Sequence, residues 1–148
     1  MQLSRPLLLL LLALPATPAA ASCTVGLGTA GVLSLQTGAT TILTSEAGVA
    51  SVIALTNVTG ILNATVTLSN PRLDAYPAGF NPAGATVEQN YSAVWLLGST
   101  NNPTFTSGSR SFTAPIGLLI TITLNNRITA PGGFKQGAYT TKTTVECS

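Results

Sequence analysis

The stretch that decides the fold class is residues 116–125, which read IGLLITITLN. Every second residue from 116 to 124 is apolar, and the polar residues of the stretch face the other way: Thr121, Thr123 and Asn125. Because side chains alternate between the two faces of a β-strand, this pattern predicts a strand with one buried face. We expect the even-numbered residues of this strand at the centre of the core.

Similar alternation recurs along the chain, and no stretch after residue 21 has a helical period. It predicts further strands at 32–36, 49–57, 61–69, 91–97 and 138–147, with 49–57 and 61–69 forming a hairpin. Proline, glycine and polar residues predict loops at 70–88, 98–109 and 129–137. The expected fold is all-β, an immunoglobulin-like β-sandwich of about seven antiparallel strands.

The N-terminus has the pattern of a secretory signal peptide, predicted to span residues 1–21. Arg5 is its only charge, residues 7–14 are an unbroken apolar run, and 15–21 are rich in small residues. The apolar run makes about 12 Å of helix, which is too short to span a membrane. We therefore expect an exported protein, secreted, periplasmic or at the cell surface, with residues 22–148 as a single β-sandwich domain.

The two cysteines, Cys23 and Cys147, lie at the two ends of the predicted domain. Exported proteins with an even number of cysteines most often pair them, so we predict a disulfide between these two residues. An alternative places Cys23 in a lipoprotein cleavage box with Ala20, Ala21 and Ser22, where Cys23 would carry a lipid. Such boxes usually have leucine at the position of Ala20.

Composition excludes several classes of function. The chain has no histidine, so a Ser-His-acid triad, a Cys-His pair and a histidine-ligated zinc site cannot form. Without Arg5, five basic and four acidic residues remain, so the net charge is near +1 and the sequence has no basic cluster of the kind that binds nucleic acid. We expect no enzyme activity, no cofactor, no metal site and no transmembrane segment.

Two parts of the chain resemble a known group of bacterial secreted domains. The first part, residues 22–25 and 31–35, is similar to the first strand of spore-coat-U-type domains. The second part, residues 133–139 followed by a threonine-rich alternation into 145–147, is similar to their last strand. Those domains are related to the immunoglobulin-like subunits of chaperone–usher pili. The resemblance implies a pilus or surface-coat role, assembly by strand addition, and a periplasmic chaperone or neighbouring subunits as partners.

This sequence departs from the pilus-subunit pattern in two ways. Pilus subunits donate an N-terminal extension to a neighbour, but here Cys23 follows the predicted cleavage site almost directly, so there is little to donate. The disulfide of pilus subunits lies within their early strands, whereas this sequence has one cysteine at each end of the domain. If 138–147 is the penultimate strand of an immunoglobulin-like domain, the last strand is missing. The domain would then accept a strand without giving one.

The sequence therefore predicts an exported structural or adhesive surface protein, a pilus-related subunit that assembles by strand addition. The alternative is a free-standing secreted binding module for carbohydrate or peptide. Tyr91, Trp95 and Asp74 are the candidate ligand contacts, against the simpler interpretation that the aromatic rings are core and Asp74 is a solvated loop charge. Tyr139, which follows a glycine, is interpreted as a corner tyrosine that ties a loop to the sheet.

Overall fold

Ten β-strands and no helix make up the described part of the chain. The computed structural model describes residues 22–26, 29–59, 63–115 and 119–148. The strands are β1 (Ser22–Gly26), β2 (Val32–Leu35), β3 (Ile42–Val49), β4 (Ser51–Thr59), β5 (Asn63–Ala75), β6 (Thr86–Trp95), β7 (Gly98–Thr106), β8 (Arg110–Pro115), β9 (Ile120–Thr129) and β10 (Thr140–Cys147). No helix within these residues is long and apolar enough to cross a membrane.

The larger sheet is built around β9. β6 pairs with β9 along nearly its whole length, so β3 and β4 share the other side of β9 and lie end to end. β1 pairs with β4 and β2 pairs with β3, and β7 pairs with the outer side of β6. All these pairs are antiparallel, and β1 and β2 together form one edge of the sheet.

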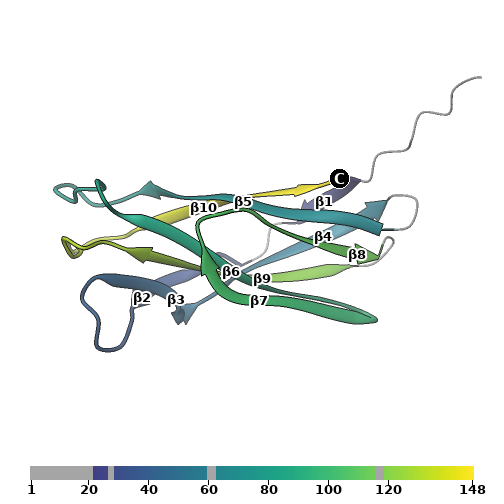
Figure 1. Cartoon of the computed structure of the whole chain (residues 1–148), viewed down its shortest axis with the longest axis horizontal. Helices are drawn as coiled ribbons and strands as arrows, with labels where there is room; N and C mark the ends of the chain where they lie inside the picture. Colours follow the sequence, from purple (N-terminus) through teal and green to yellow (C-terminus); the bar gives the residue numbers. More distant parts are fainter. Residues whose placement is uncertain (1–21, 27–28, 60–62, 116–118) are drawn as a thin grey trace, which may run out of the picture.

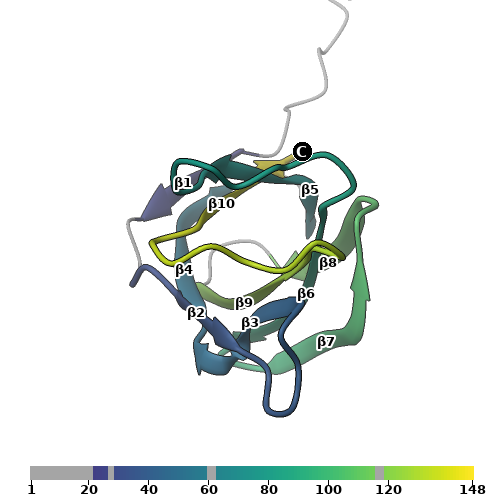
Figure 2. The same ribbon diagram turned by 90° about the vertical axis from the view of Figure 1, so that its left-hand side faces the viewer.

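The smaller sheet has the order β10–β5–β8. The pairing of β10 with β5 shifts register at two places, and at both the extra residue belongs to β5: one shift lies around Asn70 and the other at Asp74. β10 itself is therefore regular. Asn70 has a φ of 52°, which asparagine tolerates better than most residues. Figure 2 shows the two sheets curving around a common interior.

The two sheets form the immunoglobulin-like β-sandwich that the sequence predicts, with ten strands in the described residues instead of about seven. The strands of an immunoglobulin fold are lettered A to G in chain order, with A, B, E and D in one sheet and C, F and G in the other. Here β1/β2, β3/β4, β9 and β6 take the places of A, B, E and D. In the other sheet, β5 and β10 take the places of C and F. Among the described residues no strand occupies the place of the final strand, on the side of β10 away from β5.

The interior is divided into two apolar clusters by a buried polar layer. The larger contains Leu55, Ala64, Val66, Leu68, Tyr91, Ala93, Phe112, Ala114, Ile120, Ile122 and Leu124. The smaller contains Leu43, Val87 and Ile128, with Leu33, Leu73, Phe134 and Tyr139 packed against it but only partly buried. Gln89 and Asn126, which are buried cross-strand partners, lie in β6 and β9 between the residues of the two clusters. The smaller cluster is therefore separate and incompletely covered.

The strand at 116–125 is confirmed where the structure describes it. Ile120, Ile122 and Leu124 are buried, so the expected face points into the core. β9 continues to Thr129, beyond the predicted end, because alternation persists through Asn126 and Ile128. Ile116 and Leu118, and the predicted signal peptide 1–21, lie outside the described residues.

Three predictions about connections are wrong. Segments 49–57 and 61–69 do not form a hairpin, because β4 pairs in the larger sheet and β5 in the smaller one. Segment 98–109 is mostly strand β7, whose polar side chains suit an edge strand that faces solvent. The 70–88 loop is shorter than predicted, since β5 continues to Ala75 and β6 begins at Thr86.

Candidate functional site

An open apolar groove lies between β2 and the segment 134–139 that leads into β10. Its volume is about 570 Å³. Apolar side chains and glycine dominate its lining, which consists of Gly31, Val32, Leu33, Leu35, Leu43, Phe134, Lys135, Gln136, Gly137, Ala138 and Tyr139. In Figure 1, β2 and the loop before β10 lie at the left end of the molecule, far from the C-terminus.

The groove exists because the smaller apolar cluster is covered on one side only. Leu43 is buried beneath it, whereas Leu33, Phe134 and Tyr139 are only partly buried. Val32 and Leu35 are more than half exposed. Exposed apolar side chains gathered beside an incomplete core are typical of an interaction surface.

One wall of the groove is held by an aromatic cluster. Phe80 stacks on Phe134 at 5.9 Å between ring centroids and meets Tyr139 edge-on at 5.0 Å. The Tyr139 hydroxyl accepts a hydrogen bond from the Lys135 N–H (2.8 Å) and donates one to the Lys135 carbonyl oxygen (3.0 Å). These two hydrogen bonds close the loop 135–139 on itself, and the Tyr139 ring packs against the smaller apolar cluster of the sheets. This is the arrangement expected of a corner tyrosine, and the wall is preformed.

The loop packs closely on the rest of the domain at Gly137. Its φ is 138°, and a Cβ atom at this position would lie 2.7 Å from the Pro77 side chain. Only glycine combines this backbone conformation with so close an approach. The wall is thus fixed by backbone geometry as well as by aromatic packing.

The backbone of β10 presents polar groups toward the side away from β5. Thr65 and Ser148 exchange both backbone hydrogen bonds, at 2.8 and 3.0 Å. Along a regular antiparallel strand, every second residue makes such a pair, so Ser148 and the even-numbered residues of β10 point their N–H and C=O groups toward β5. The odd-numbered residues, including Thr141 and Val145, point these groups away from β5. Among the described residues no strand pairs with this edge.

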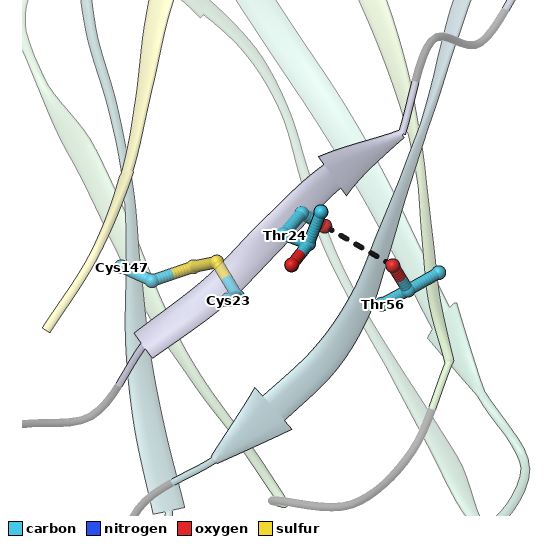
Figure 3. The surroundings of a disulfide bond; sticks show 4 residues. All are labelled: Cys23, Thr24, Thr56 and Cys147. Carbon is cyan, nitrogen blue, oxygen red and sulfur yellow. Dashed lines mark hydrogen bonds between the residues drawn. A yellow bond between two sulfur atoms is a disulfide. The ribbon is translucent and has the colours of Figure 1, made fainter.

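The Cys23–Cys147 disulfide is confirmed and joins the edges of the two sheets. It links β1 to β10, with 6.0 Å between the two Cα atoms and a sequence separation of 124 between the cysteines (Figure 3). Both cysteines pack against the larger apolar cluster. The bridge lies at the end of β10 opposite the groove.

The structure does not gather the three candidate ligand residues on one surface. Tyr91 is 6% exposed and stacks on Phe112 inside the larger cluster, with 5.2 Å between ring centroids. Trp95 packs against the same cluster from the end of β6. Asp74 lies in β5, where its carboxylate binds the Lys142 ammonium at 2.8 Å.

Two further carboxylates, Glu46 and Glu88, lie on other strands than Asp74 and also have partners. Glu88 accepts two hydrogen bonds from the Arg127 guanidinium, which also lies over the ring of Phe105. Glu46 accepts a hydrogen bond from the Asn90 amide at 3.3 Å. Within the described ranges, no group of three His, Cys, Asp or Glu residues could hold a metal ion.

Sequence reasoning did not identify the groove. Leu33 looks like an ordinary strand residue, Leu43 lies in β3 outside the predicted strands, and Phe134 lies in a segment expected to be only a turn. The useful signal was Phe134 itself, an aromatic residue between glycine and lysine in a loop. Comparisons with protein-family models, with curated proteins and with solved structures found no match to this chain.

Proposed function

We propose that this protein is an exported structural or adhesive surface subunit that accepts an extended segment of a neighbouring protein. The observation that carries the proposal is the apolar groove at the edge of an immunoglobulin-like sandwich in which the final strand position is empty among the described residues. An added strand would satisfy backbone groups along β10 and cover Leu33, Phe134 and Tyr139.

The chemistry of the groove favours a peptide strand over a sugar. A sugar needs several hydrogen-bonding side chains around its hydroxyl groups, and burying hydroxyls without partners is unfavourable. Lys135 and Gln136 are the only lining residues with side chains that are charged or carry an amide. An extended peptide matches its own N–H and C=O groups to the strand edge and places apolar side chains in the groove.

Export and a non-catalytic role belong to the same proposal. The pattern of residues 1–21 and the disulfide both suit an oxidising compartment outside the cytoplasm. The separate, partnered carboxylates and the absence of histidine from the sequence support binding rather than catalysis. A periplasmic chaperone or a neighbouring subunit is the partner that this role requires, in keeping with the resemblance to spore-coat-U-type domains.

A charge placed in the groove should block binding without unfolding the protein. Leu35 lines the groove and is 52% exposed, so Leu35→Asp should be nearly neutral for stability. It should weaken binding of a fluorescent peptide of alternating valine and threonine by about tenfold or more, because the charge would be desolvated by the bound peptide. Fluorescence anisotropy measures the affinity.

Leu96→Asp is the matched control. Leu96 is 80% exposed in the turn between β6 and β7, away from the groove lining. This variant should bind the peptide like the parent protein. Equal affinities for the parent, Leu35→Asp and Leu96→Asp would place peptide binding outside the groove, and no binding to the parent would contradict strand acceptance.

A further inference from the structure

The disulfide lies on the same pair of edges as the groove. β1 and β2 follow one another along the edge of the larger sheet, and the segment 134–139 leads directly into β10. Gly31 lies eight positions after Cys23 on one side, and Tyr139 lies eight positions before Cys147 on the other. The bridge therefore joins the two edges at one end, and the groove lies between them at the other end.

At the bridge there is no room for another strand. A strand inserted between two edges needs about 9.6 Å, twice the usual spacing of about 4.8 Å between neighbouring strands. The Cα atoms of Cys23 and Cys147 are 6.0 Å apart. The two edges cannot separate here while the bond is intact.

β1 is also held from its other side. Thr24, Val25 and Gly26 pair with β4, and the Thr56 hydroxyl donates a hydrogen bond to the Thr24 carbonyl oxygen at 3.5 Å (Figure 3). Moving β1 aside would break this pairing as well as strain the bridge. The end of the edge near Cys147 is therefore closed to a partner.

Building on the proposed function, we infer that the Cys23–Cys147 bridge limits the accepted segment to about five residues, inserted at the groove end only. The open part runs along Gly31–Leu35, which measures about 17 Å at 3.3 Å per residue. The segment is extended and uncharged, and places a bulky apolar side chain among Leu33, Leu43, Phe134 and Tyr139. The disulfide thus limits the length of the bound segment and also holds the two sheets together.

A series of peptides tests the limit. Alternating valine–threonine peptides of about four to twelve residues are titrated into the oxidised protein. The affinity should rise up to about five residues and change less than about twofold beyond that, since each additional backbone hydrogen bond would otherwise strengthen binding several-fold. Continued tightening by about tenfold between six and twelve residues would overturn the inference.

The double variant Cys23→Ala/Cys147→Ala is the comparison. Where circular dichroism shows that it remains folded, the twelve-residue peptide should bind it about tenfold more tightly than the six-residue peptide. Equal affinities of the two peptides for the folded variant would show that the bridge does not set the length, and would overturn the inference.

Amide hydrogen exchange on the oxidised protein gives the same answer without any variant. With the twelve-residue peptide bound, protection should be gained at Thr141 and in the preceding loop but not at Val145, whose N–H points to the same side of β10 near the bridge. New protection at Val145 would overturn the length limit but leave strand acceptance intact. Failure of every peptide to bind would instead contradict the proposed function, and the inference with it.

Discussion

Removing the disulfide is expected to lower the free energy of unfolding by about 5 kcal/mol on the loop-entropy model. The bond joins residues 124 apart, so it closes nearly the whole domain into one loop and greatly restricts the unfolded chain. It also fixes the edges of two sheets that share no strand pairing. Urea unfolding of the parent protein and of Cys23→Ala/Cys147→Ala measures the difference.

The reduced parent protein is the control for this experiment, because it loses the bond without changing the two residues. Reduced parent and double variant should unfold at similar urea concentrations, both far below the oxidised parent. A difference of less than about 1 kcal/mol between oxidised and bond-free proteins would show that the edges hold together without the bridge.

Replacing Ile122 by Asp is expected to unfold the domain. Ile122 is fully buried in β9, between Ile53 of β4 and Ala93 of β6. A carboxylate there would have no charged partner, and its burial should cost several kcal/mol, a large part of the roughly 5–15 kcal/mol that stabilises a typical domain. Thermal unfolding followed by circular dichroism measures the loss.

Thr123→Asp is the matched control one residue along the same strand. Thr123 is half-buried and its side chain points to the opposite face of the larger sheet from Ile122. This variant should melt within a few degrees of the parent. Similar melting temperatures for both variants would mean that the buried face of β9 is assigned incorrectly.

Much of the fold follows from local sequence pattern. Alternation marks β9 because its even-numbered face is buried between two sheets, and export with two cysteines predicts the disulfide. Pairing partners do not follow in the same way. The segments 49–57 and 61–69 flank a turn signal that fits a hairpin and a crossover between sheets equally well, and the structure has the crossover.

The groove depends on tertiary structure that no local pattern encodes. Leu33, Leu43, Phe134 and Tyr139 are distant in sequence and meet only when β2 lies opposite the loop before β10. Strand β7 was missed for a related reason. Its side chains alternate between exposed and partly buried positions without an apolar face, since it is an edge strand.

Amide exchange at two neighbouring residues of β10 tests strand acceptance most directly. The Lys142 N–H points toward β5 and the Thr141 N–H points away from it. In the free oxidised protein, the Thr141 amide should exchange about a hundredfold faster than the Lys142 amide. A saturating valine–threonine peptide should slow Thr141 to a rate close to that of Lys142 and leave Lys142 unchanged. A Thr141 amide that is already as slow as Lys142 without peptide, or that stays fast with peptide bound, would contradict an open edge that accepts a strand.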